Sequence, residues 1–183
     1  MTRKEMSEIF AALLLAYPHA DVFKGGIQKL GPTINLWTTC LSEIDFWTGQ
    51  QAVIKLCRVC KFPPTIAEFR EQADNVKSEV QQRVNSAWTL LRFDLEDKSP
   101  SEVYAALDER SQTKLAIAAM GGPEKLIVQS EHVYGDGRRE PYTHFDYQGF
   151  ASAYERLLKR PIELTGTRTE MLVSNMKQIE GRR

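Results

Sequence analysis

Apolar side chains recur at helical spacing from residue 6 to residue 60. The first stripe consists of Met6, Ile9, Phe10, Leu13, Leu14 and Tyr17. Steps of three and four residues place such a set on one face of a helix, so an amphipathic helix is predicted that ends before Pro18. Two further stripes predict two more helices, the first with Ile34, Trp37 and Leu41, the second with Phe46, Val53, Cys57 and Cys60.

A fourth and longer helix is predicted to begin at Ile66. Its apolar positions alternate in steps of three and four along Ile66, Phe69, Ala73, Val76 and Val80, and Ala87 and Leu91 extend the same seam. Between Glu71 and Arg83 the other positions are almost all polar or charged. This is typical of a solvent-exposed helix that connects two modules, so we place the domain boundary within it, after residue 75.

The second half of the chain repeats the helical pattern. Ser99, Pro100 and Glu102 combine a capping box with a proline in the first turn, which predicts the start of a helix. The glycine-containing segment 134–141 is predicted to be a loop, and 143–158 the last core helix. No segment alternates apolar and polar residues for long enough to predict a strand.

These patterns predict an all-α fold: a small N-terminal helical bundle at 1–75, a long connecting helix that leads into a second small helical module at 76–160, and a flexible tail at 161–183. Four tail residues fall along one edge of a short predicted helix: Met171, Leu172, Met176 and Ile179. We interpret this edge as a partner-binding peptide, because methionine adapts to varied surfaces. The alternative is a frayed terminus without a binding role.

The corner between the third and fourth helices has the most distinctive local sequence. Pro63 and Pro64 lack backbone N–H donors and restrict the residue before them, so the chain must leave the helix at Phe62. Thr65 and Glu68 then have the spacing of a capping box, which starts the next helix. From the residues alone, this corner is a rigid helix-to-helix connection with nothing reactive in it.

The order of the motifs in the first half resembles a known family. The residues that carry the resemblance are, in chain order, Tyr17, Pro18, Trp37, Phe62, Pro63, Pro64, Thr65 and Glu68. This set, within about residues 4–75, is similar to the N-terminal domain of the phage replicative helicase loader/inhibitor family. The segment 24–31, with three glycines, departs from the family pattern as a longer loop before the second helix.

The resemblance implies a non-enzymatic accessory protein of phage DNA replication. Such a protein binds the host's DnaB-type hexameric replicative helicase, inhibits its ATPase and unwinding activities, and loads it at the phage origin. Further partners that the resemblance suggests are a phage origin-binding initiator and a single-strand-binding protein. The expected location is the cytoplasm of the bacterial host.

Composition and charge argue against several other classes. The chain has 24 basic and 24 acidic residues, unlike a dedicated duplex-DNA binder, so we expect little direct DNA binding. No apolar run reaches the roughly 18 residues of a membrane span. The first charged residues are followed at once by Glu5 and Glu8, unlike a signal peptide, and we expect a cytosolic protein.

The sequence shows no pattern for catalysis, cofactor binding or metal binding. Neither of its Gly-Gly pairs is followed by the Lys-Ser/Thr of a phosphate-binding loop. Cys57 and Cys60 form a C-x-x-C, but no second pair accompanies them and the three histidines are scattered. Two small apolar residues on a buried helix face are the better interpretation, and we expect no enzyme activity, no cofactor and no metal.

The main alternative is a helical DNA-binding transcriptional regulator whose recognition helix follows the Pro63-Pro64 corner. In the first turns of that helix, Arg70 is the one side chain of the usual base-reading kind, and Glu68 and Glu71 flank it. Acidic neighbours disfavour an approach to phosphate. A purely structural phage protein is a third interpretation that the sequence leaves open.

Overall fold

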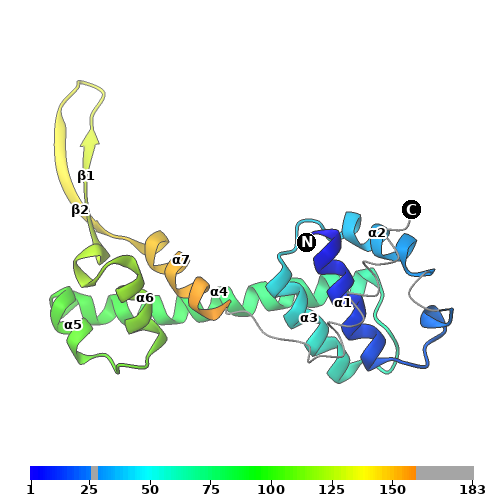
Figure 1. Cartoon of the computed structure of the whole chain (residues 1–183). Coiled ribbons are helices and arrows are strands. Elements are labelled where there is room, and N and C mark those ends of the chain that lie inside the picture. Colours follow the sequence, from blue (N-terminus) through cyan, green and yellow to red (C-terminus); the bar gives the residue numbers. More distant parts are fainter. Residues whose placement is uncertain (26–28, 160–183) are drawn as a thin grey trace. The chain divides into compact units, whose positions relative to one another are not determined.

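The computed structural model describes residues 1–25 and 29–159 (Figure 1). Within these residues it contains α-helices, short 3₁₀-helices and one two-stranded sheet. By internal contacts the described residues divide into two compact units, called here the N-terminal unit (Met1–Ser78) and the C-terminal unit (79–159). The boundary between them falls inside one helix, α4 (Ile66–Asp97).

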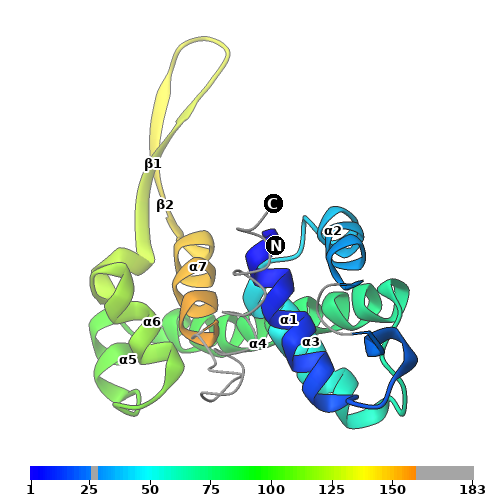
Figure 2. The same cartoon turned by 45° about the vertical axis from the view of Figure 1, so that its right-hand side comes forward.

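The N-terminal unit is a bundle of α1 (Arg3–Ala16), α2 (Gly31–Cys40), α3 (Phe46–Val59) and the first turns of α4, with the 3₁₀-helix η1 (Asp21–Phe23) between α1 and α2. Local capping explains where the helices begin. Thr2 and Glu5 form a capping box before α1, and the Asp45 carboxylate accepts a hydrogen bond from the Thr48 amide before α3. Helix α1 packs against both α2 and α3 (Figure 2).

The predicted apolar stripes supply most of the core of the N-terminal unit, and Phe23, Leu30, Ile44, Ala52 and Leu56 complete it. Its fully buried side chains include Met6, Ile9, Leu13, Ile34, Leu41 and Phe69. The Trp37 ring meets the Phe10 ring edge-on at a centroid distance of 5.2 Å and the Phe69 ring at 5.6 Å. Trp37 therefore links α1, α2 and the start of α4 in one aromatic cluster.

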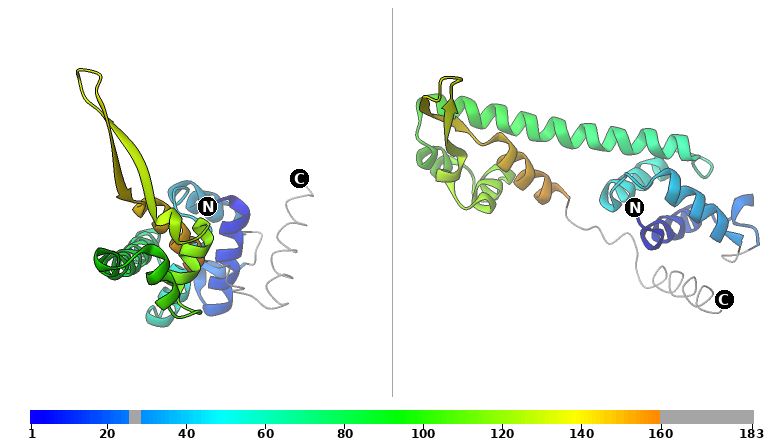
Figure 3. Two further views of the ribbon diagram at one scale, coloured as in Figure 1. Left: turned by 90° about the vertical axis from the view of Figure 1, so that its left-hand side faces the viewer. Right: turned by 90° about the horizontal axis from the view of Figure 1, so that it is seen from above.

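Helix α4 is 32 residues long, which corresponds to a length of about 48 Å. Figure 3 shows it as one continuous ribbon. Phe69 and Ala73 belong to the core of the N-terminal unit, and Val84 and Leu91 belong to the core of the C-terminal unit. One helix thus supplies core residues to both units.

The C-terminal unit packs the second half of α4 with α5 (Pro100–Ala106), α6 (Gln112–Met120), the 3₁₀-helix η3 (Pro123–Leu126) and α7 (Tyr147–Leu158). Ser99 and Glu102 form the capping box of α5, and Gly121, at φ 105°, ends α6 in the left-handed conformation. Phe150 is fully buried, and its ring lies 5.2 Å from that of Trp88.

The all-α prediction is wrong in one place. Strands β1 (Ile127–Val133) and β2 (Arg139–Phe145) pair antiparallel, with Ile127 opposite Phe145 and Val133 opposite Arg139. The last helix consequently begins at Tyr147, capped by Asp146, and not at residue 143. Most residues of both strands are exposed on both faces, so no apolar and polar alternation could reveal them. Gly137, at φ 84°, allows the turn that joins them.

Candidate functional site

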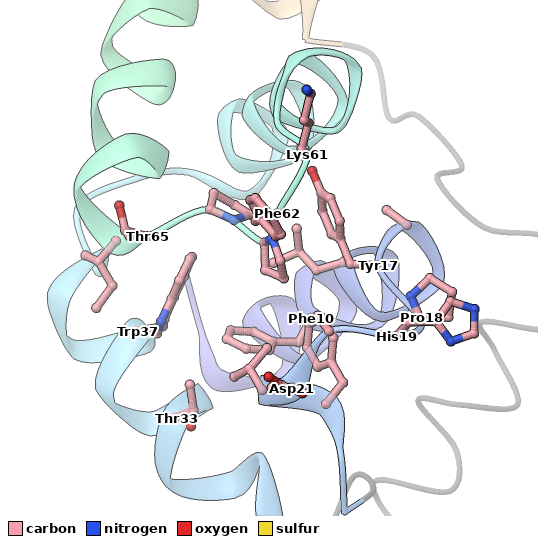
Figure 4. A pocket seen from close by; sticks show the side chains of 18 residues that line it. Phe10, Tyr17, Pro18, His19, Asp21, Thr33, Trp37, Lys61, Phe62 and Thr65 are labelled. Atoms are coloured by element: carbon pink, nitrogen blue, oxygen red, sulfur yellow. The ribbon is translucent and has the colours of Figure 1, made fainter.

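The N-terminal unit carries an open groove beside the Pro63-Pro64 corner, with a volume of about 750 Å³ (Figure 4). Four segments form it: the C-terminal end of α1, the segment through η1, one side of α2 and the corner itself. Most of its lining is apolar, and the polar side chains among the lining residues are His19, Asp21, Thr33, Lys61 and Thr65, besides the Tyr17 hydroxyl. An apolar concave site with few polar groups is the usual form of a binding surface.

Two proline turns create the hollow. Pro18 follows the end of α1 and the chain turns into η1, while Pro63 and Pro64 turn the chain away from α3 before α4 begins. Pro64 is buried and Pro63 is half-buried, so the corner is packed against the bundle rather than free in solvent. The groove lies between these two turns, where neither helix can continue to fill the space.

Rigid core side chains form the floor of the groove. Phe10 and Trp37 line it, and Trp37 is 7% exposed and held between two other rings. In Figure 4, Trp37 and Tyr17 lie on opposite sides of the hollow, with Phe62 near its upper edge. A floor that belongs to the hydrophobic core is formed before any partner arrives, which lowers the entropy cost of binding.

The rim of the groove exposes large apolar side chains. Phe62 is 77% exposed and Val22 is 49% exposed, and both line the groove. Contact with a partner would remove this apolar surface from water, which is favourable. Exposed aromatic side chains beside an apolar depression are typical of protein–protein contact sites.

Tyr17 joins the two turns that border the groove. Its hydroxyl donates a hydrogen bond to the Cys60 carbonyl oxygen, 3.1 Å away, and so ties the end of α1 to the end of α3. Burial, together with the neighbouring Cys57 thiol, raises the pKa of Tyr17 to about 12. Burial also raises the pKa of Cys57, which keeps this thiol protonated and unreactive at neutral pH.

In an alkaline absorbance titration, a Tyr17→Phe variant should lack the tyrosine ionisation that occurs at the highest pH in the wild type. The pKa of Tyr17 is about 12 in the folded chain and 10 for an ordinary tyrosine. Between these two pH values the unfolded chain releases this proton and the folded chain keeps it, so rising pH should lower the stability of the wild type. Titration at 295 nm checks this, and the expectation is wrong if both proteins titrate identically above pH 11.

The capping box at the corner fixes the start of α4. Glu68 Oε2 accepts hydrogen bonds from the Thr65 amide at 2.7 Å and from the Thr65 hydroxyl at 2.8 Å. In return, Thr65 Oγ1 accepts a hydrogen bond from the Glu68 amide at 3.3 Å. The hydrogen bonds from Thr65 lower the pKa of Glu68, so the cap is complete at neutral pH.

Arg70 makes contacts inside the N-terminal unit. Its guanidinium group donates a hydrogen bond to the Cys40 carbonyl oxygen and pairs with the Glu43 carboxylate at 2.9 Å. These contacts attach the first turns of α4 to the end of α2. They leave this arginine poorly placed to read DNA bases as the recognition-helix interpretation requires.

Seven of the eight structural-motif residues that carry the family resemblance meet at the groove. The lining includes Tyr17, Pro18, Trp37, Phe62, Pro63, Pro64 and Thr65, and Glu68 supports the corner through Thr65. The predicted partner-binding residues Met171, Leu172, Met176 and Ile179 lie outside the described residues. Sequence reasoning missed Val22 on the rim, because η1 is too short to show a periodic pattern.

Two other kinds of feature are absent from the described residues. In 1–25 and 29–159 there is no group of three or more His, Cys, Asp or Glu side chains that could hold a metal ion. Over the same ranges, no helix combines the length and apolar character that a membrane crossing requires.

Comparison with known proteins assigns the segment that contains the groove. Residues 1–70 match the family model of the phage helicase loader/inhibitor N-terminal domain. Every residue that lines the groove falls inside this match. No curated protein and no solved structure matches the chain. Residues 1–70 of this chain are therefore similar to the N-terminal domain of the phage helicase loader/inhibitor family.

Proposed function

We propose that this protein binds the DnaB-type hexameric replicative helicase of a bacterial host, inhibits its ATPase and unwinding activities, and loads it at a phage origin. The observation that supports this most directly is the coincidence of the family match with the groove: residues 1–70 contain the whole apolar site. The proposed helicase contact is this groove, with Phe62 as its exposed anchor.

The chemistry of the groove suits an apolar segment of the helicase. Trp37 and Phe10 offer a preformed floor, and Phe62 at the rim adds area that becomes buried on contact. A factor that binds one conformation of a ring more tightly than the others shifts the ring toward that conformation. Inhibition then follows from binding alone, because a ring held in one state cannot complete the cycle of its ATPase.

The alternative as a DNA-binding regulator has less support. The chain as a whole carries no net charge, and Arg70 is already paired with Glu43. Duplex binding draws most of its affinity from contacts between basic side chains and phosphates. A neutral chain with its candidate base-reading arginine engaged lacks both the general attraction and the specific contact.

The deciding experiment mixes the full chain with the host helicase in the presence of nucleotide. We expect a complex of defined mass in native mass spectrometry and a lower ATPase rate at micromolar concentrations. Failure to form a complex under these conditions would contradict the proposal. If the chain instead bound duplex DNA, with an affinity that fell steeply with salt concentration, the regulator interpretation would be supported.

Deletion of residues 161–183 provides a separate prediction about the tail. We expect the truncated protein to keep its helical circular dichroism and its melting temperature but to bind the helicase more weakly, because Met171, Leu172, Met176 and Ile179 are proposed as a second contact. The matched control keeps the full length and replaces these four residues with serine. Equal helicase affinity for the full-length, truncated and substituted chains would contradict the tail prediction and leave the groove proposal standing.

A further inference from the structure

The β1–β2 ribbon has unused hydrogen-bonding capacity along its edges. Within the described residues it consists of these two strands only, and the hairpin extends away from the helices of its own unit (Figures 1 and 3). Ile127 is 38% exposed and Val133 is 57% exposed. A lone two-stranded ribbon is marginally stable in water, and its outer edges offer a template for another strand.

The register shows which backbone groups point outward. At the two ends of the ribbon, the Tyr134 amide donates to the Arg138 carbonyl and the Asp146 amide donates to the Leu126 carbonyl, both at 2.9 Å. In an antiparallel pair, hydrogen-bonded and non-hydrogen-bonded pairs alternate along the register. The odd-numbered residues between these ends therefore direct their N–H and C=O groups outward: Ile127, Gln129, Glu131 and Val133 on β1, and Arg139, Pro141, Thr143 and Phe145 on β2.

The two edges are not equivalent. Pro141 lies near the middle of β2 at one of the outward positions, where it supplies no N–H group. A strand approaching β2 would meet a missing donor and the bulk of the proline ring. Strand β1 contains no proline, so each of its outward positions keeps an N–H group. β1 is the open edge of the ribbon.

The sequence of β1 is complementary to itself in the antiparallel direction. About a two-fold axis at Ser130, Ile127 comes opposite Val133 and Gln129 comes opposite Glu131. The first pair is apolar, and in the second the amide can donate to the carboxylate. Glu131 also pairs with Arg139 at 3.3 Å, so the two Glu131 side chains near such an axis would each be balanced.

We propose that the open edge of β1 pairs with β1 of a second copy of this chain, giving a four-stranded antiparallel sheet with a two-fold axis at Ser130. In this register, the outward N–H and C=O groups of all four odd-numbered residues of β1 find partners on the second copy. A register centred on a neighbouring residue shortens the overlap or places an apolar residue opposite Glu131 or Gln129. The interface is isologous, as in most homodimers.

The dimer is expected to be reversible and weak. Two seven-residue strands bury much less surface than the roughly 1,600 Å² of a standard stable interface. Disulfide cross-linking of an introduced cysteine therefore detects the dimer more reliably than a measurement of mass in solution. Ser130 is the position to use, because a residue on the axis would form a non-hydrogen-bonded pair with itself. Its two Cα atoms would lie about 4.5 Å apart, within the range of a disulfide.

The test places a single cysteine in the full chain after replacing Cys40, Cys57 and Cys60 with serine or alanine. Under mild oxidation by a glutathione buffer, Ser130→Cys should form a disulfide-linked dimer at least tenfold faster than Thr143→Cys. Thr143 is more exposed than Ser130 but lies on the edge that carries Pro141, so it is the matched control. Equal rates at the two positions, or no dimer at either, would overturn the proposal.

A second variant places a proline at an outward position of β1, as Pro141 is placed on β2. Gln129→Pro removes an outward amide without touching the bonds between β1 and β2, so the hairpin should remain and sedimentation equilibrium should show less dimer than for the wild type. Wild-type association by this variant would contradict the proposal. A second result would also contradict it: a wild-type chain that stays monomeric at all concentrations and whose β1 amides are protected from hydrogen exchange only when helicase is added. The β1 edge would then pair with a strand of the helicase.

Discussion

Replacing Phe69 with alanine is expected to lower the free energy of unfolding by about 3–5 kcal/mol. Phe69 has no exposed surface and its ring packs against Trp37 in the first turns of α4. The substitution removes a large buried side chain and leaves a cavity between α4 and α2. Chemical denaturation followed by tryptophan fluorescence would measure the loss as a lower denaturant midpoint.

Phe93→Ala is the matched control for this effect. Phe93 lies on the same helix but is 70% exposed, so its removal should change the unfolding free energy by less than about 0.5 kcal/mol. Similar midpoints for the two variants would mean that Phe69 is not the core residue that its burial indicates.

Replacing Phe62 with glutamate is expected to weaken the helicase complex at least tenfold, or by about 1.4 kcal/mol, without changing the fold. Phe62 lines the groove and is 77% exposed, so it contributes little to folding. The substitution removes the proposed anchor and places a carboxylate beside an apolar surface that the partner must cover. Isothermal titration calorimetry against the host helicase measures the affinity, and circular dichroism checks the helical content.

Val59→Glu provides the control for a new surface charge. Val59 is 75% exposed near the same corner but does not line the groove. This variant should bind the helicase as the wild type does. A loss of affinity that is equal in both variants would indicate a general charge effect, and no loss in Phe62→Glu would remove the groove from the proposed interface.

Much of the N-terminal unit could be predicted from its sequence because each helix carries its own signals. The stripe from Met6 to Leu13 is buried, and Asp45 caps α3 as expected. Thr65 and Glu68 form their capping box at the start of α4. These signals are local: they depend on spacing and on hydrogen bonds within a few residues.

The ribbon could not be predicted in the same way. A strand buried on one face shows alternating apolar and polar residues, but β1 and β2 are mostly exposed on both faces. Their contacts are made across the hairpin and to a helix: the Tyr134 hydroxyl, just after β1, donates to Glu140 of β2 at 2.7 Å, and Trp88 of α4 meets Phe145 of β2 edge-on. Such cross-strand and tertiary contacts leave no periodic trace in the sequence.

The groove could be predicted in part: better than the ribbon, but less completely than the helices of the N-terminal unit. Proline chemistry predicted both turns that border it, at Pro18 and at Pro63-Pro64, and seven of its 18 lining residues are among those that carry the family resemblance. Neither could show that the turns face each other across a hollow, since this depends on how α1 and α3 pack. The exposure of Phe62 is likewise a property of the assembled corner.

Pro141 limits how far any assembly through the ribbon can grow. A sheet that offers two open edges can add strands without end, which is the route to fibres. Here one edge carries a proline, so a strand that pairs with β1 closes the only open side of the described ribbon. Two copies joined in this way present a proline on each outer edge. The sheet therefore ends at four strands, and higher concentration should give saturation at the dimer rather than polymerisation.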